Sequence, residues 1–185
     1  AVVLHVMDAD GSNITQVTYN QSHDLDPTVL DSGEVAFVRW ENMGSRNALS
    51  LYRMQPDGTG LELFYGAHSH ATGTDGAEVH FLQPRERADG LLLAVKLPLS
   101  GSYRGGELVL IDTENYIDND QPTATNSGIL NGPAQRAATI NDVHTDGSIS
   151  PGGRFSSAWP LRDGTDRMLV SWSECRQLGS TRIVS

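Results

Sequence analysis

The sequence predicts an all-β protein assembled from repeated antiparallel hairpins. Glycine and proline, which terminate strands and form turns, account for 19 and 8 of the 185 residues. Short apolar runs alternate with these turns along the chain, and helical periodicity is weak. Two hairpin patterns also recur at a fixed spacing, which indicates an internal repeat.

The first repeated pattern is an apolar run ending in Met, an Asp-Gly turn and a second apolar run. It occurs around Met7 and again around Met54, 47 residues further on. A third copy at 107–113 retains the strand and the acidic residue, but a polar insertion at 114–133 displaces its turn. We expect each copy to form strand, turn and strand.

A second pattern, strand, Gly turn and strand, lies between the copies of the first. It occurs at 28–37, 80–94 and 157–171. Because the two patterns alternate, each repeat contains four strands. A four-stranded repeat of this kind is the blade of a β-propeller, in which strand A is innermost and strand D outermost.

The expected domain organisation is one propeller segment over 1–185, with about two complete blades and two incomplete ones. Residues 1–22 end a first blade, 23–66 form the second, 67–141 form the third with the insertion at 114–133, and 142–185 begin a fourth. Propellers close with about 4 to 8 blades, so we expect these residues to belong to a longer chain. The insertion is poor in apolar residues, and we expect it to lie outside the sheets, either as an irregular flap on the propeller rim or as a contact with missing parts of the protein. The alternative is an unrelated antiparallel sandwich with coincidental Asp-Gly turns.

The composition restricts the class of partner. With 13 basic and 23 acidic residues the formal charge is −10, which repels phosphate backbones and anionic headgroups. No apolar run approaches the roughly 20 residues that span a bilayer. We therefore expect neither nucleic-acid binding nor membrane insertion, and a cationic protein, metal ion or ligand suits the chain better. The single cysteine, Cys175, excludes an internal disulfide and a zinc ribbon.

The N-terminal third resembles the TolB-like (WD-type) β-propeller repeat. The motifs that carry the resemblance are Asp8-Ala9-Asp10-Gly11-Ser12, Val17-Thr18, Asp26-Pro27 and Ser32-Gly33. The later part is similar to the propeller region of bacterial envelope proteins related to the hydrazine synthase alpha subunit, through Gln83-Pro84-Arg85, Leu110-Ile111-Asp112-Thr113 and Ser171-Trp172-Ser173. The resemblance implies a periplasmic or extracellular bacterial protein.

Two departures from these families limit what the resemblance implies. The Ser-Pro-Asp-Gly motif is eroded to Leu30-Asp31-Ser32-Gly33 and to Ser150-Pro151-Gly152-Gly153. No Cys-x-x-Cys-His haem attachment is present, so haem would have to be supplied by another segment or chain. A hydrazine-forming activity is not implied.

Connections between blades would gather polar residues on one face, because D-to-A and B-to-C connections share that face. The candidate binding residues there are His23, Asp24, Asp26, Arg39, Trp40 and His144. The same face would hold a candidate metal set, His68, His70, Asp75 and Cys175, whose nitrogen, oxygen and sulfur atoms suit zinc or another divalent metal.

Each of these candidates has an alternative interpretation. The loop at 66–76 is rich in glycine, and its histidines could simply bond backbone carbonyls. Cys175 could be a nucleophile with His144 or His70 as its base, or an inert cysteine beside Trp172. The Asp8-x-Asp10 spacing resembles a calcium loop, but Tyr19 stands where a bidentate Glu is needed, so an Asx-type turn is favoured.

Three functions remain open at this point. The leading one is a non-catalytic propeller module of a larger secreted or periplasmic protein, which binds a protein or ligand, or the remainder of the same polypeptide, through its loop-rich face. The second is a segment of a metal- or haem-dependent redox enzyme of the hydrazine-synthase-alpha-like type. The third is a purely structural propeller at a domain boundary. Elemental analysis separates the second from the others.

Overall fold

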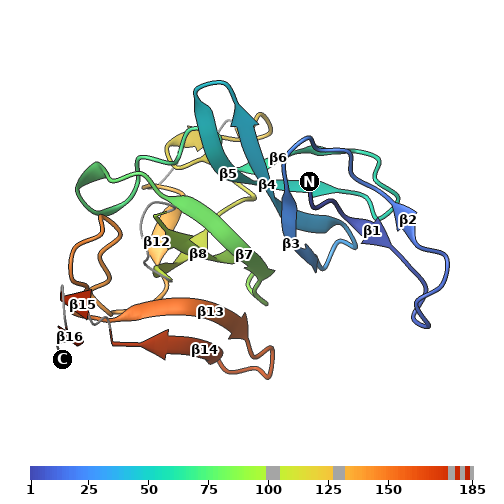
Figure 1. Ribbon diagram of the computed structural model, residues 1–185. Coiled ribbons are helices and arrows are strands. Elements are labelled where there is room, and N and C mark those ends of the chain that lie inside the picture. Colours follow the sequence, from blue (N-terminus) through green and yellow to red (C-terminus); the bar gives the residue numbers. More distant parts are fainter. Residues whose placement is uncertain (99–104, 127–131, 175–177, 180–181, 184–185) are drawn as a thin grey trace.

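The computed structural model describes residues 1–98, 105–126, 132–174, 178–179 and 182–183, and it confirms the all-β prediction. Two four-stranded antiparallel sheets form the body of the molecule (Figure 1). In the described part of the chain the single helical element is the 3-10 turn η1 (Thr74–Gly76), and no helix is long and apolar enough to cross a membrane.

The two large sheets share one topology, in which successive strands are neighbours. The N-terminal sheet consists of β3 (Asp24–Val29), β4 (Val35–Met43), β5 (Arg46–Met54) and β6 (Glu62–Tyr65). The central sheet consists of β7 (His80–Glu86), β8 (Leu92–Leu97), β9 (Glu107–Ile111) and β12 (Gln135–Ala137). These sheets lie within 23–66 and 67–141, the segments for which complete four-stranded units were expected.

The remaining strands form two-stranded hairpins. These are β1 (His5–Val6) with β2 (Thr15–Gln16), β10 (Tyr116–Asp118) with β11 (Gln121–Pro122), β13 (Arg154–Pro160) with β14 (Met168–Ser173), and β15 (Leu178–Gly179) with β16 (Arg182–Ile183). The β1–β2 and β13–β14 hairpins lie on opposite sides of the two large sheets (Figure 1).

The central sheet is buried on both faces, which explains its unbroken apolar runs. On β8, Leu92 and Ala94 pack toward the N-terminal sheet, whereas Leu93 and Val95 belong to a second core with Phe155 of β13. Successive residues of a strand point to opposite faces, so a strand between two cores needs apolar residues at every position.

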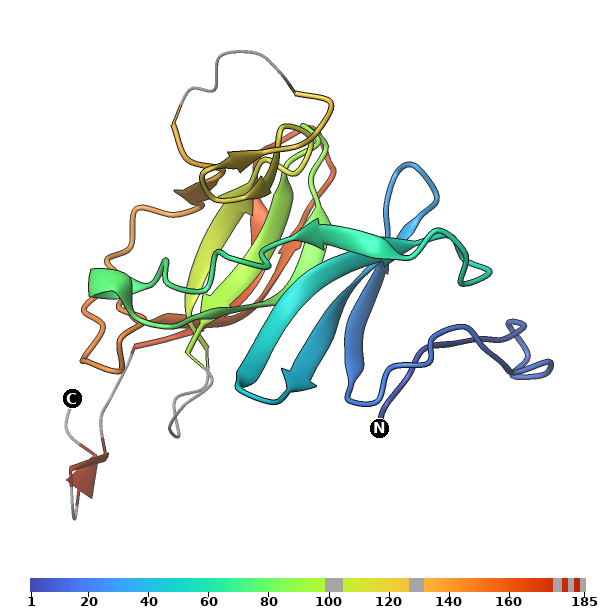
Figure 2. The same ribbon diagram turned by 90° about the horizontal axis from the view of Figure 1, so that it is seen from above.

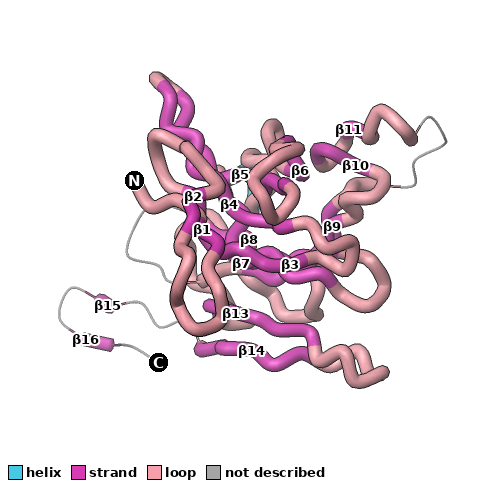
Figure 3. Tube along the Cα trace, turned by 90° about the vertical axis from the view of Figure 1, so that its right-hand side faces the viewer, coloured by secondary structure: helices cyan, strands magenta, loops and turns pink. Residues whose placement is uncertain are grey.

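The first strands of the three successive units lie next to one another. β7 contacts both β3 and β13, which places it between them (Figures 1 and 3). Two of these strands carry a bulge at the same kind of dipeptide, Asp26-Pro27 in β3 and Gln83-Pro84 in β7. Asp26 and Gln83 both have positive φ, 51° and 53°, so the repeat extends to an uncommon backbone conformation.

The insertion at 114–133 lies outside the two four-stranded sheets, as expected, but its described part is not an irregular flap. Its described part forms the β10–β11 hairpin, and Tyr116 and Asp118 are buried. Asp118 Oδ1 accepts hydrogen bonds of 2.7 Å from the His68 N–H and from Ser69 Oγ. Figure 2 shows this yellow segment beside the end of the central sheet. A few polar contacts therefore anchor a segment that is too polar to form a core of its own.

Candidate ligand-binding site

The candidate site is a cavity of about 320 Å³ between β7 and the β13–β14 hairpin, which we call the Arg85 cavity. Its lining residues come from three strands: Gln83, Arg85, Ser157, Ala158, Trp159, Leu169, Val170 and Ser171. β7 and β13 are first strands of adjacent units, so their contact brings together side chains far apart in the sequence.

Arg85 and Trp159 are the two side chains that give this cavity its chemistry. The guanidinium carbon of Arg85 lies 4.7 Å from the centre of the Trp159 ring, within the range of a cation–π interaction. Arg85 Nη1 donates a 2.7 Å hydrogen bond to the carbonyl of Pro84, while Nε is buried without a partner. Burial lowers the pKa of Arg85, and the nearby Asp26 carboxylate opposes that shift.

The bulge in β7 connects this site to the neighbouring first strand. The register of β7 shifts between Leu82 and Arg85, where Gln83 takes the left-handed conformation. The Gln83 N–H donates a 3.2 Å hydrogen bond to Asp26 Oδ2. The Asp26 carboxylate is therefore bonded to the backbone at the bulge, and no ion pair joins it to Arg85 in the described structure.

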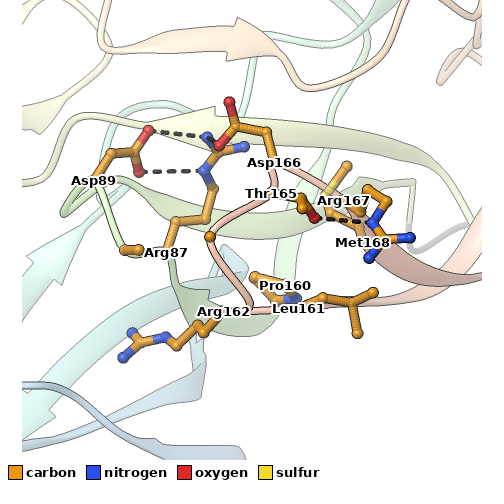
Figure 4. Close-up of a pocket in the computed structure, with 11 residues that line it drawn as sticks. Arg87, Asp89, Pro160, Leu161, Arg162, Thr165, Asp166, Arg167 and Met168 are labelled. Atoms are coloured by element: carbon orange, nitrogen blue, oxygen red, sulfur yellow. Dashed lines mark hydrogen bonds and ion pairs between the residues drawn. The ribbon is translucent and has the colours of Figure 1, made fainter.

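A second cavity of about 270 Å³ lies further along the same strands, where the turns of two hairpins meet (Figure 4). Three arginines line it, and each already has acidic partners. Arg87 Nη2 lies 3.0 Å from Asp89 and 3.5 Å from Asp166, and Arg167 Nη2 lies 2.7 Å from Asp163. Arg162 pairs with Asp31 and donates a hydrogen bond to the carbonyl of Glu86. It thereby joins the turns of the β3–β4, β7–β8 and β13–β14 hairpins. This cavity is charge-compensated by the chain itself.

Four of the residues predicted for the binding face form a compact internal network. Arg39 donates from Nε and Nη2 to the two carboxylate oxygens of the fully buried Asp24, at 2.8 and 3.0 Å. The rings of His23 and Trp40 are stacked, with centres 5.3 Å apart. Asn20 Nδ2 completes the network with bonds to Asp24 Oδ1 and to the carbonyls of His23 and Trp40. Asp26 lies apart from this network, at the bulge contact with Gln83.

His70 has the role that the alternative interpretation gave to the loop histidines. Its Nδ1 lies 2.7 Å from the carbonyl oxygen of Val79, and its Nε2 lies 3.2 Å from Ser50 Oγ. Its ring centre is 5.2 Å from that of His80. Burial lowers the pKa of His70. Both ring nitrogens are thus occupied by protein partners.

The described structure does not assemble the predicted metal set. His68 contributes its backbone N–H to Asp118, and Asp75 lies exposed on η1. Cys175 lies outside the described residues. Among the described residues no three His, Cys, Asp or Glu side chains are grouped to hold a metal. The zinc or other divalent metal site remains a prediction, for which elemental analysis is the measurement.

His144 is also placed away from the Arg85 cavity. Its Nδ1 lies 2.8 Å from Ser148 Oγ and its Nε2 lies 3.3 Å from Asp142 Oδ1. These are contacts within its own connection, between the central sheet and β13. A pairing with Cys175 falls outside the described residues.

Arg85 and Trp159 are not among the site residues predicted from the sequence. A signal was present, because Asp26-Pro27 and Gln83-Pro84 occur at matching positions of two repeats, and Arg85 follows the second. Trp159 carries no such signal. It acquires its role only because the β13–β14 hairpin packs beside β7.

Comparison with known proteins supports the fold alone. No family model matches the sequence, and no curated protein matches it. Among solved structures, the Kuenenia stuttgartiensis Hydrazine Synthase is similar over 93% of this chain, with a TM-score of 0.60 and 23% sequence identity. The matched region is 19% of that chain, so the present residues correspond to a small part of it. The similarity shows a shared all-β architecture.

Proposed function

We propose that the chain is a β-propeller module of a larger secreted or periplasmic bacterial protein, and that it binds further polypeptide along β14. The propeller assignment is supported by the repeated four-stranded sheets and by the contact of their first strands at β3, β7 and β13. It is also supported by the likeness to part of a much longer solved chain. The observation that carries the binding proposal is the exposure of β14.

β14 occupies the same place in its unit as β4 and β8 occupy in theirs. Each of the three strands pairs antiparallel with the first strand of its unit. In each unit the second residue pair from the turn is Thr28–Ala36, Arg85–Leu93 or Trp159–Leu169, so Leu169 is equivalent to Ala36 and Leu93, which are completely buried. Leu169 is 68% exposed. A position that is in the core of two units is therefore open in the third.

The difference arises from what lies beside each strand. β4 pairs with β5 and β8 pairs with β9, whereas β14 pairs only with β13 among the described residues. An unpaired edge with exposed Leu169, Val170 and Trp172 is a surface for strand addition. We propose that its occupant is the remainder of the same polypeptide, as two strands in the positions of β9 and β12 and a further sheet over Leu169.

Self-association of the isolated chain tests this surface. Without its occupant, the edge should pair with a second copy, so sedimentation velocity should show concentration-dependent association. Leu169→Lys should weaken that association about tenfold or more, because burial of a leucine contributes roughly 1.5 to 3 kcal/mol and a lysine reverses it. Ile140→Lys is the matched control, since Ile140 is fully exposed and belongs to the connection after β12 rather than to β14. Equal association of the wild type, Leu169→Lys and Ile140→Lys would contradict the proposal.

Hydrogen exchange in the longer polypeptide tests the identity of the occupant. The amides of β14 that point away from β13 should exchange at least about 100-fold more slowly there than in the 185-residue chain, because strand pairing protects them. The same rate in both would show that the remaining polypeptide does not cover this edge.

A further inference from the structure

We propose that the Arg85 cavity binds a carboxylate group carried on an apolar body. This inference deepens the proposed binding function and rests on it, because Leu169 and Val170 line the cavity and also belong to the surface along β14, so the ligand would bind between the strands that line the cavity and the sheet proposed to cover Leu169. Three features support it: an arginine without an acidic partner, a neighbouring carboxylate that is already hydrogen-bonded, and an apolar wall beside the arginine.

Arg85 forms no ion pair in the described structure, whereas six other described arginines do. Side chains with acidic partners within 4 Å are Arg39, Arg46, Arg53, Arg87, Arg162 and Arg167. Arg85 has one hydrogen bond, from Nη1 to the Pro84 carbonyl, and its Nε is buried without an acceptor. Arg85 is half-buried and its Nε lacks an acceptor, so an incoming anion gains more here than at a fully solvated arginine.

The chain does not satisfy this charge from its own acidic residues. Asp26 is the acidic group close enough to influence Arg85, but its Oδ2 accepts the Gln83 N–H across the two bulges. The bulges therefore hold Asp26 in place beside the cavity without an ion pair to the guanidinium. Within the described structure the Arg85 guanidinium therefore has no ion-pair partner, although the net charge of the chain is −10.

The other lining residues indicate the body of the ligand. Trp159 presents an aromatic ring that is 56% exposed, and Ala158, Leu169 and Val170 add aliphatic surface. Arg85 is the one cation among the lining residues, which matches a singly charged carboxylate better than a phosphate dianion that needs more donors. The site thus fits a carboxylate attached to a flat apolar group, whether from a small molecule or from an acidic side chain of a partner peptide.

Tryptophan fluorescence with a pair of isosteric probes tests the site directly. We expect 3-phenylpropionate to perturb the emission saturably with a Kd on the order of 1 mM, as for a ligand of its size with one ion pair. The neutral amide, 3-phenylpropionamide, should bind at least about tenfold more weakly, because a hydrogen bond to a charged group contributes roughly 1.5 to 3 kcal/mol. Equal binding of acid and amide would overturn the proposal.

Variants assign the effect to Arg85. Arg85→Gln should abolish the preference for the acid, and Trp159→Phe should remove most of the emission change. Arg167→Gln is the matched control, since Arg167 is exposed, paired with Asp163 and lines only the neighbouring cavity. An unchanged acid preference in Arg85→Gln would contradict the assignment. The acid and amide comparison on the wild-type chain needs no variant, so it decides the proposal even where Arg85→Gln fails to fold.

Two further measurements identify the source of the carboxylate and test the carboxylate site independently of the β14 surface. A blocked peptide with one Glu between two Phe residues should bind more tightly than 3-phenylpropionate where the natural ligand is a protein segment, and more weakly where it is a small molecule. Arg85→Gln should leave the self-association through β14 unchanged. If the wild-type chain self-associates but does not prefer the acid, the carboxylate site is wrong and the β14 surface stands. If the chain prefers the acid but does not self-associate, the β14 surface is wrong.

Discussion

At the level of single residues, the buried His80 and the half-buried His70 join the N-terminal sheet to the central sheet. His80 Nδ1 accepts a 3.1 Å hydrogen bond from the Leu49 N–H, which requires an unprotonated Nδ1. His70 bridges Ser50 and the Val79 carbonyl beside it. Burial lowers the pKa of His80 to about 4 and lowers that of His70. Both histidines are therefore held neutral by the packing of the sheets.

This arrangement predicts that mild acid destabilises the fold. Above the unfolded pKa of about 6.5, His80 is neutral in both the folded and the unfolded chain. Below that pH the unfolded chain binds a proton at His80, whereas folded His80 stays neutral until about pH 4. Stability should therefore fall as the pH drops from about 6.5 to about 4, by roughly 1.4 kcal/mol per pH unit from His80, and the lowered pKa of His70 acts in the same direction.

Urea denaturation at pH 7, 5.5 and 4.5 measures the effect. His80→Gln should flatten the pH dependence, and His5→Gln, at an exposed position of β1, is the control that should not. Charged groups around the pair are Glu41, Arg46 and Glu78. A pH dependence that survives in His80→Gln would show that these groups, rather than the histidine, govern the acid response.

At the level of elements, the repeated Asp-Gly turns are equivalent in sequence but differ in surroundings. Gly11 and Gly58 lie 47 residues apart, and both have φ of +87°. A Cβ on Gly11 would meet nothing within 4 Å, whereas a Cβ on Gly58 would lie 2.5 Å from the carbonyl oxygen of Val17. The turn between β5 and β6 thus packs against the chain that follows β2.

The pair of glycines provides a test of this contact. Gly11→Ala should cost about 1 kcal/mol in the free energy of unfolding, from the left-handed conformation alone. Gly58→Ala carries the same backbone cost and must also displace Val17, so it should cost about 1 to 3 kcal/mol more. Chemical denaturation of both variants gives the difference, and equal losses would mean that the β1–β2 hairpin does not pack against the N-terminal sheet at this turn.

At the level of the whole molecule, stacking of the units decides which equivalent residues are buried. Leu93 lies in the second core between the central sheet and the β13–β14 hairpin, with no exposed surface. Leu169 occupies the matching place in the last hairpin, and no described part of the chain covers it. The two leucines therefore differ in what packs on them and not in their place in the repeat.

Truncation of the two leucines measures this difference. Leu93→Ala should cost about 2 to 5 kcal/mol in the free energy of unfolding, from lost burial and the cavity left behind. Leu169→Ala should change it by less than about 0.5 kcal/mol in the monomeric chain. Urea denaturation at a concentration where the chain is monomeric is the measurement. Comparable losses would show that the described units do not share the core seen between β8 and β13.

Local patterns in the sequence were sufficient to predict the all-β class and the turns between paired strands such as β5 and β6. These features depend on turn residues and on apolar runs a few residues long, such as Asp57-Gly58 and 91–95, which act on neighbouring residues whatever the rest of the chain does. Buried Asp118 shows where this reasoning was wrong, because polar composition does not reveal that a distant Ser69 supplies the hydrogen bond.

The candidate site was decided by tertiary structure. Asp24 and Arg39 were predicted for an open binding face, yet antiparallel pairing of β3 with β4 places them opposite each other as a buried ion pair. Arg85 and Trp159, 74 residues apart, meet because β7 and β13 lie side by side. The sequence determines which groups a strand carries. The interaction energy of a charged group depends on its partners and on its access to water, and both are set by elements that pack against it from elsewhere in the chain.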